Sequence, residues 1–348
     1  MKTNDKKLIS LILPAYNEEA ILEQSLEIIT SHLQEYGSEF DWEILIIDDG
    51  SKDNTYNLAL KCAEKYDNLK VLKHPVNMNL GTSIKTGFAN ATGDYFITYD
   101  LDLSYSPDHI IKIANTLQVT KNDLVIASPY HKNGKVSNVP FLRKVLSRYV
   151  NYFMYLIAQR KVRTFTGMVR GFKAEFARSL NLKAMDYEIN PEIIYKALIL
   201  RASMVEIPAH LDWEWQNSFG KKRASGLRML RGIFSGLMSG FIFRPYIFFL
   251  TVGIVTFLLF AYMFVWLTIH IVQSYPIISS TGTYFDDHFS MVVAHVFENW
   301  PHLFFVCGFT LIVSFQFISL GFISLQNKRY FEEGFHISSS ILKKVREQ

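Results

Sequence analysis

The sequence contains little cysteine and little net charge. Cys62 and Cys307 are the only cysteines among 348 residues, and no Cys-x-x-Cys pair occurs. This pattern indicates neither a disulfide framework nor a zinc site. The formal net charge is +4 at pH 7, and no basic tract accompanies a base-reading motif. We therefore expect no nucleic-acid partner.

Charged side chains are missing from two long C-terminal segments. Residues 245–272 and 301–326 contain no Asp, Glu, Lys or Arg and are rich in Phe, Leu, Ile and Val. Each segment exceeds the roughly 20 residues with which a helix crosses a bilayer. Buried helices of soluble proteins are also apolar, but two of this length favour the membrane. We expect two transmembrane helices, and hence the lipid bilayer as a partner.

The distribution of basic residues predicts the orientation of these helices. The link at 273–300 contains acidic residues but no Lys or Arg, whereas basic residues occur at 221–244 and after 327. The positive-inside rule then places residues 273–300 outside the cytoplasm and the tail at 327–348 inside it. The polar N-terminus shows no signal peptide, so we expect residues 1–224 to form a cytoplasmic domain with both termini inside.

The first part of the chain alternates short apolar runs with amphipathic segments. This alternation predicts a parallel sheet covered by helices on both faces. The expected strands are residues 8–13, 43–47, 70–73, 95–99 and 124–127, and the expected helices are 19–33, 55–66, 81–91 and 107–117. Ligands of such sheets bind at the carboxyl ends of the strands. Polar clusters occur there, at residues 14–18, 48–51, 77–81 and 100–104.

Two further segments combine an apolar stripe with basic residues. Phe141–Ile157 and Lys221–Arg244 place apolar residues at helical spacing beside several Arg and Lys. Basic amphipathic helices of this kind suit an anionic membrane surface. We therefore expect interfacial helices, with residues 225–244 as a juxtamembrane helix. The alternative is that each stripe packs on the sheet.

Asp100 and Asp102 are the most informative residues. They follow the apolar run Tyr95–Ile97 and precede a turn at Pro107. Residues i and i+2 of an extended chain point to the same side, so both carboxylates could face one cation. Mg²⁺ or Mn²⁺ held by one or two carboxylates and by substrate phosphates is typical of sites with a phosphate leaving group. Alternatively, two acids in a turn are solvated or cap a helix.

Together, the motifs resemble family 2 glycosyltransferases of the GT-A fold. The residues that carry this resemblance are Pro14-Ala15-Tyr16-Asn17-Glu18, Ile47-Asp48-Asp49-Gly50-Ser51, Asn79-Leu80-Gly81, Asp100-Leu101-Asp102-Leu103-Ser104 and Phe165-Thr166-Gly167-Met168-Val169-Arg170. With two C-terminal membrane helices, the similarity is closest to dolichyl-phosphate mannose synthases and polyprenyl-phosphate glycosyltransferases. The resemblance implies a Rossmann-like domain with a mostly parallel sheet.

The resemblance also implies the donor site. Residues expected to bind the nucleotide sugar are Pro14, Tyr16, Glu18, Ile47, Asp49, Asp100, Leu101, Lys222, Arg223 and Ser225. Asp100, Asp102 and Ser104 match the family's metal site, with Ser104 where a Gln often stands. Turns and helix caps would explain several of these residues equally well, and membrane-surface charge would explain Lys222 and Arg223.

On the acceptor side, a cation must hold the lipid phosphate. Arg148 and Arg170 are the expected residues, with Arg143 next, because Arg binds phosphate through two parallel hydrogen bonds. Glu192 matches a Glu that relatives carry near the acceptor site, although a helix start explains it nearly as well. Pro129 stands where the family often has Arg. The alternatives for Arg148 and Arg170 are head-group binding and a salt bridge.

The expected function is inverting transfer of one hexose from a UDP- or GDP-sugar to polyprenyl phosphate, with Asp102 as a catalytic residue. A phosphate acceptor needs positioning more than a strong base, since its second pKa is about 6. We therefore expect no catalytic histidine, and interpret His74, His109 and His131 as surface or loop residues. The alternatives are a processive polysaccharide synthase, which the absent Gln-x-x-Arg-Trp motif disfavours, and a catalytically silent sugar-nucleotide-binding membrane partner. A homo-oligomer is left open.

Overall fold

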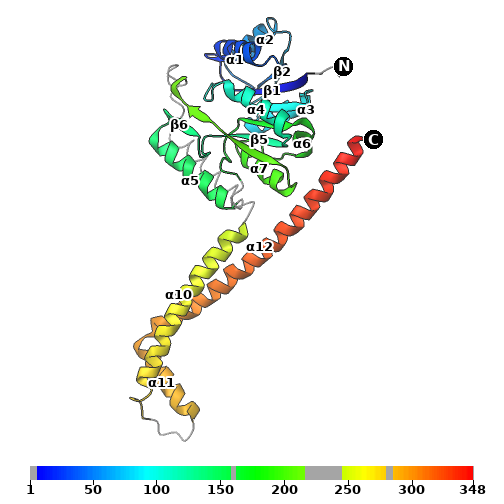
Figure 1. The fold of residues 1–348 in the computed structure, drawn as a ribbon. Coiled ribbons are helices and arrows are strands. Elements are labelled where there is room, and N and C mark those ends of the chain that lie inside the picture. Colours follow the sequence, from blue (N-terminus) through cyan, green and yellow to red (C-terminus); the bar gives the residue numbers. More distant parts are fainter. Residues whose placement is uncertain (1–5, 158–161, 216–244, 280–284, 348) are drawn as a thin grey trace. The chain divides into compact units, whose positions relative to one another are not determined.

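The computed structural model describes residues 6–157, 162–215, 245–279 and 285–347 (Figure 1). The chain divides into two compact units. One unit contains all the described strands, and the other corresponds to residues 241–331. The expected juxtamembrane helix at 225–244 lies outside the described residues.

The first unit is built on a seven-stranded sheet with the order β3-β2-β1-β4-β7-β5-β8. Its strands are β1 (Lys7–Ala15), β2 (Phe40–Asp48), β3 (Leu69–Lys73), β4 (Tyr95–Thr98), β5 (Leu124–Ser128), β7 (Arg170–Lys173) and β8 (Met204–Pro208). All neighbours are parallel except β7, which runs antiparallel to both β4 and β5. The mostly parallel α/β class expected from the sequence is confirmed.

Helices cover both faces of this sheet. On one face, α1 (Leu22–Tyr36), α2 (Thr55–Ala63) and α4 (Asp108–Thr120) share an apolar core with β1 and β2. On the other, α3 (Leu80–Asn90) packs on β1 and β2 and contacts α6 (Ala174–Ser179) and α7 (Ile189–Ile199). Because both faces are covered, the central strands are apolar throughout, as in Ile44–Ile47. Burial of each such side chain contributes about 1.5–3 kcal/mol.

Close contact between α3 and the sheet depends on Gly87. A Cβ atom at this position would lie 2.5 Å from Cγ2 of Ile12, so any larger residue would push the helix off the strand. This packing holds α3 beside the carboxyl ends of β1 and β2, where the polar clusters of the sequence are found.

Helix α5 spans Phe141–Ile157, as expected from its amphipathic pattern. It follows β6 (Lys135–Ser137), which pairs in parallel with β9 (His210–Asp212). Val150 and Met154 of α5 are buried. In contrast, a large apolar surface of this helix is exposed, formed by Phe141, Leu142, Tyr149, Tyr152, Phe153 and Leu156.

The second unit is formed by α10 (Pro245–Ser274), α11 (Phe285–Asn299) and the first part of α12 (Pro301–Glu347). Two helical segments, Pro245–Ser274 and Pro301–Ser338, are long and apolar enough to cross a membrane. In the most apolar 18-residue stretch of each helix, only 6% and 22% of the residues are buried. Core helices of soluble proteins are mostly buried, so these two helices differ from them. The link predicted at 273–300 contains α11, and the helix that begins at Pro301 continues beyond residue 326.

Helices α10 and α12 meet within this unit through small residues. The Ser314 hydroxyl donates to the carbonyl oxygen of Gly253 at 3.1 Å. A Cβ at Gly253 would lie 2.7 Å from Cγ1 of Ile318. Close approach through glycine and serine is common between membrane helices, because it allows dense packing and interhelical hydrogen bonds.

Candidate active site

Hydrogen bonds join the loops that follow β1 and β2. The main-chain N–H of Asn17 donates to Oγ of Ser51 at 2.9 Å, and the N–H of Lys52 donates to Oδ1 of Asn17 at 2.8 Å. The N–H of Glu18 donates to Oγ1 of Thr55 at 2.8 Å. Asn17 adopts a positive φ of 55°, which Asn tolerates better than most residues. The motifs at 14–18 and 48–53 thus form one hydrogen-bonded surface at the carboxyl edge of the sheet.

Asp49 is buried at this edge and is held by two donors. Its Oδ1 accepts a hydrogen bond from the N–H of Met78 at 2.9 Å and lies 2.7 Å from Nδ1 of His74. Nε2 of His74 lies 2.9 Å from Oγ1 of Thr86 on α3. His74 is 6% exposed. His74 lies in the loop after β3, as expected, but it is not a surface residue, because the end of β3 and α3 together enclose it. The interpretation of His109 as a surface or loop residue is wrong, since it is 5% exposed and lies on α4.

The neighbouring Asp48 points into the protein. Its side chain is fully buried, and Oδ1 accepts from the N–H of Ser51 at 3.3 Å. Within the described part of the chain, Oδ2 of Asp48 has no hydrogen-bond partner. The two adjacent acids therefore differ, since Asp49 is fixed by strong donors whereas Asp48 is largely desolvated.

Asp100 and Asp102 lie on a turn, because β4 already ends at Thr98. The N–H of Ser104 donates to Oδ1 of Asp102 at 3.0 Å, and Leu103 adopts a positive φ of 50°. Asp102 and Ser104 are buried, while Asp100 is partly exposed. The chain is therefore not extended here, contrary to our expectation that an extended backbone points both carboxylates to the same side.

Two buried tyrosines, Tyr99 and Tyr105, flank the turn that contains Asp100 and Asp102. The hydroxyl of Tyr99 donates to the carbonyl oxygen of Tyr105, which closes the segment that carries Asp100 and Asp102. Burial raises the pKa of the Tyr105 hydroxyl far above its usual value, and the negative charges of Asp100 and Asp102 add to this effect. Tyr105 therefore stays protonated and can act only as a neutral hydroxyl beside the two acids.

A divalent cation fits the donor set only together with a substrate. Within residues 6–157, 162–215, 245–279 and 285–347, no group of three or more His, Cys, Asp or Glu side chains could hold a metal. Asp100 and Asp102 would supply two carboxylates at most. Mg²⁺ accepts such an arrangement, because phosphate oxygens and water complete its six ligands. Metal binding at Asp100, Asp102 and Ser104 remains a prediction.

The remaining donor-site residues differ in accessibility. Tyr16 is exposed, and Pro14 and Glu18 are partly exposed, so their side chains reach the surface at this edge. Ile47 and Leu101 are buried in the apolar interior. Their side chains pack in the protein interior beneath the loops of the site and are not accessible to a ligand. Lys222, Arg223 and Ser225 lie outside the described residues.

Arg170 is placed differently from our expectation. Its side chain is 0% exposed, and the guanidinium donates to the carbonyl oxygens of Asn190 and Phe165, each at 2.7 Å. Burial lowers the pKa of Arg170 to about 9, which leaves it cationic at neutral pH. A lipid phosphate cannot reach a fully enclosed guanidinium. We therefore correct the expected phosphate-binding role of Arg170 to a structural one.

Glu192 also serves the fold. Its carboxylate accepts hydrogen bonds from the N–H groups of Lys183 and Ala184 at 2.8–3.1 Å and forms a buried ion pair with Lys196 at 2.7 Å. These donors fix the start of α7 against the preceding loop. Both carboxylate oxygens are thus occupied, which corrects the expected acceptor-site role of Glu192.

Arg148 remains available on α5, where its side chain is exposed. Arg143 is partly exposed, and its guanidinium carbon lies 4.3 Å from the ring centroid of Trp213. This cation–π contact fixes Arg143 to the end of β9. Of the three arginines considered for the acceptor phosphate, Arg148 is therefore the most accessible.

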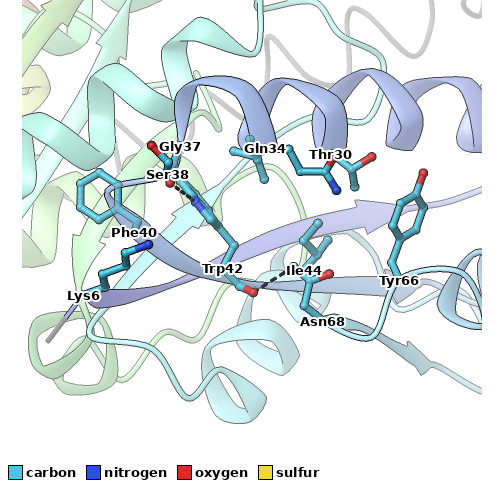
Figure 2. A pocket seen from close by; sticks show the side chains of 11 residues that line it. Lys6, Thr30, Gln34, Gly37, Ser38, Phe40, Trp42, Ile44, Tyr66 and Asn68 are labelled. Atoms are coloured by element: carbon cyan, nitrogen blue, oxygen red, sulfur yellow. Dashed lines mark hydrogen bonds between the residues drawn. The ribbon is translucent and has the colours of Figure 1, made fainter.

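A shallow groove lies at the opposite edge of the sheet (Figure 2). Phe40, Trp42 and Ile44 of the amino-terminal half of β2 line it, together with Lys6 and Asn68. The indole N–H of Trp42 donates to the carbonyl oxygen of Gly37 at 2.9 Å. No carboxylate lines this groove, and it is remote from the strand ends that carry Asp49 and Asp102. It is not the donor site.

Comparison with known proteins identifies related sequences. The family model described as glycosyl transferase family 2 matches residues 10–180. A dolichol-phosphate mannosyltransferase of Pyrococcus furiosus is 33% identical over 203 residues, which cover 58% of this chain and 55% of that protein. The chain thus spans little more than half of that relative's length.

A second relative is matched over more of its length. The dolichyl-phosphate beta-glucosyltransferase ALG5A of Trichomonas vaginalis is 31% identical over 231 residues, 63% of this chain and 69% of that protein. Among solved structures, mannosyl-3-phosphoglycerate synthase of Rubrobacter xylanophilus aligns with a TM-score of 0.49 and 13% identity, covering 67% of this chain and 72% of that one. The assignment rests on the sequence matches: the chain belongs to glycosyl transferase family 2, a family of glycosyltransferases.

Proposed function

We propose that this glycosyltransferase moves one hexose from a UDP- or GDP-sugar to polyprenyl phosphate. The observation that carries the proposal is the placement of Asp49, Asp100 and Asp102 after β2 and β4, at the carboxyl edge of a family 2 domain. Two relatives bear the names of dolichyl-phosphate sugar transferases, and this supports a lipid phosphate as the acceptor.

On the donor side, the joined loops of β1 and β2 would receive the nucleoside. Asp49 offers a fixed carboxylate oxygen to a base or ribose donor, and the exposed ring of Tyr16 could stack beside the base. Asp100 and Asp102 would face the diphosphate through Mg²⁺ or Mn²⁺. When bound, this cation would neutralise charge on the departing nucleoside diphosphate.

The reaction would be a direct, inverting displacement. A phosphate oxygen of the acceptor forms a bond to the anomeric carbon while the bond from that carbon to the diphosphate oxygen breaks. The electron pair leaves with the nucleoside diphosphate. The attacking phosphate is already anionic near neutral pH, so the protein contributes mainly position and charge neutralisation. Asp102, buried and fixed by the N–H of Ser104, would be the residue closest to this step.

Arg148 is the residue we propose to hold the acceptor phosphate. It is exposed on α5, beside the apolar surface formed by residues such as Tyr149 and Phe153. An exposed apolar surface with adjacent cations suits the interface of an anionic membrane, where the phosphate of a polyprenol would lie. We propose that the two apolar helices cross this membrane, with the catalytic domain and both termini on the cytoplasmic side.

The test is a transfer assay with the full-length protein. Purified enzyme would be incubated with Mg²⁺ or Mn²⁺, undecaprenyl or dolichyl phosphate, and a panel of labelled UDP- and GDP-sugars. We expect a lipid-linked sugar from at least one donor and none when EDTA is present. Absence of a product from every donor would refute the proposed function. Product formation in EDTA would refute only its metal dependence.

A further inference from the structure

The two carboxylate oxygens of Asp49 differ in their hydrogen bonding: Oδ1 already accepts two hydrogen bonds, and Oδ2 is open to a ligand. Its Oδ1 receives two donors, the N–H of Met78 and the ring of His74. A carboxylate oxygen has two lone pairs in the plane of the group, so these two donors use Oδ1 completely. Among the described residues, none hydrogen-bonds Oδ2 of Asp49, and this atom is not enclosed as Oδ2 of Asp48 is. Asp49 therefore offers a ligand a single acceptor atom.

The orientation of His74 follows from its two partners. Because a carboxylate only accepts, Nδ1 of His74 carries the proton that points to Asp49. In the neutral ring Nε2 is then the acceptor, and the hydroxyl of Thr86 donates to it. The contact with Asp49 is buried and the contact with Thr86 is partly buried, so the ring is held in one orientation from both sides. This chain of bonds fixes which oxygen of Asp49 faces outward.

A single open oxygen distinguishes between nucleobases. The Watson–Crick edge of uracil has one donor, N3–H, between two carbonyl acceptors. The same edge of guanine has two adjacent donors, N1–H and the 2-amino group, whose parallel N–H bonds match the two oxygens of a carboxylate. When only one oxygen is open, one of the two donors is left without a straight hydrogen bond. A buried donor left without a partner weakens binding, and the effect is about tenfold or more.

We infer that His74 is a specificity-determining residue, which saturates Oδ1 of Asp49 and thereby selects a uracil nucleotide over a guanine nucleotide. The inference rests on the proposed function, in which Asp49 contacts the nucleobase. His74 acts through Asp49 and makes no contact with the ligand. His74 is therefore a positioning residue, and its effect should be measurable as a change in the ratio of the affinities for UDP and GDP.

The experiment measures binding of UDP and of GDP to the full-length protein in detergent by titration calorimetry with Mg²⁺. We expect the wild type to bind UDP at least about tenfold more tightly than GDP. In His74→Leu, Asp49 is free to turn, so UDP binding should weaken about tenfold and the UDP-to-GDP ratio should fall close to one. In His74→Asn, the side-chain amide replaces the Nδ1 donor, and the ratio should recover.

Two further variants separate selectivity from folding. His109→Leu removes another buried histidine, which bonds to the backbone at Ser106 and His210, and it should leave the ratio unchanged. Thr86→Val removes only the donor to Nε2, so it should lower the UDP-to-GDP ratio less than His74→Leu does. The Thr86→Val variant therefore still tests the inference if the His74→Leu protein does not fold. A purely structural role of His74 would weaken both nucleotides equally.

The outcomes separate the inference from the function on which it rests. Equal affinity of the wild type for UDP and GDP would overturn the inference, and so would a His74→Leu or Thr86→Val protein that keeps the wild-type ratio. In both cases nucleotide binding itself, and with it the proposed function, would stand. A wild-type protein that binds neither nucleotide would overturn both.

Discussion

Nη1 of Arg170 donates to the carbonyl oxygen of Asn190 at 2.7 Å, inside the first unit and out of contact with solvent. Nη2 donates at the same distance to the carbonyl oxygen of Phe165. One guanidinium thus ties β7 to α7 and to the segment that precedes β7. Among the described residues, no carboxylate lies within hydrogen-bonding distance of it. Burial therefore lowers its pKa, and electrostatic interactions with Tyr105 and Glu206 offset this effect only in part.

Replacing Arg170 should therefore affect stability first. In Arg170→Lys, one ammonium group cannot reach both carbonyl oxygens, so a buried acceptor loses its partner at a cost of about 1–3 kcal/mol. We expect a lower thermal unfolding temperature of the full-length protein. Arg163→Lys, at an exposed arginine, is the matched control and should unfold as the wild type does. Unchanged stability of Arg170→Lys would contradict the structural role.

Arg148 should behave in the opposite way. If its guanidinium holds the acceptor phosphate, Arg148→Ala should raise the KM for polyprenyl phosphate by about tenfold or more, because charge-assisted hydrogen bonds are lost. Thermal stability should be unchanged, since the side chain is exposed. Steady-state kinetics at varied acceptor concentration measures this effect, with Arg163→Ala as the control for loss of one surface charge. A wild-type KM would exclude Arg148 from the acceptor site.

Asp102 should be required for transfer. Asp102→Asn keeps the shape of the side chain but removes the charge proposed to hold the metal, so we expect kcat to fall by at least about 100-fold. The matched control is Asp94→Asn, which removes a carboxylate that pairs with Lys7 at the surface. Initial rates over a Mg²⁺ titration provide the measurement. Transfer by Asp102→Asn at the native rate would refute the metal assignment.

Mild acid should destabilise the protein through His109. Burial lowers the pKa of His109, and the charges of Lys112 and His210 lower it further. The hydrogen bond to the Ser106 carbonyl and the charge of Asp108 raise the pKa, but they do not outweigh burial. Because the unfolded chain then binds the proton more readily than the folded protein, this contribution to stability is present above about pH 6.5 and is lost as the pH falls below it. Unfolding temperatures should fall between pH 7 and pH 5.5 in the wild type, and less so in His109→Asn. Parallel pH profiles of the two proteins would contradict this assignment.

The contact between α10 and α12 should tolerate no side chain at Gly253. In Gly253→Val, the new Cβ would lie 2.7 Å from Cγ1 of Ile318, and overpacking of this kind costs about 1–3 kcal/mol. Gly308→Val is the matched control, because nothing lies within 4 Å of a Cβ at that position. Thermal unfolding in detergent should separate the two variants. Equal unfolding temperatures would show that the helices do not meet at Gly253.

Much of the fold was predictable because its signals are local. The expected strands and helices of residues 8–127 all occur, with ends that differ by a few residues, since apolar periodicity follows directly from burial on one or both faces. Strand β7 was not predicted. It has only four residues, two of them charged, and it forms because β4 and β5 leave room for an antiparallel partner between them.

The candidate site was predictable only in part. The sequence indicates that acids follow β2 and β4, because strand ends and turn residues can be recognised locally. It does not indicate which acid faces the ligand. Asp48 and Asp49 are neighbours in the chain, yet one is enclosed and the other is fixed by His74, a residue 25 positions away.

The sequence by itself therefore determined the α/β class, the two apolar helices and the residue types at the carboxyl edge of the sheet, since each depends on composition and spacing along a short stretch. Only the tertiary structure decided that Arg170 and Glu192 support the fold, that Arg148 stays accessible and that His74 holds Asp49. The physical reason is that burial and hydrogen bonding of a polar side chain depend on segments distant in sequence, and no local pattern records which segments will meet.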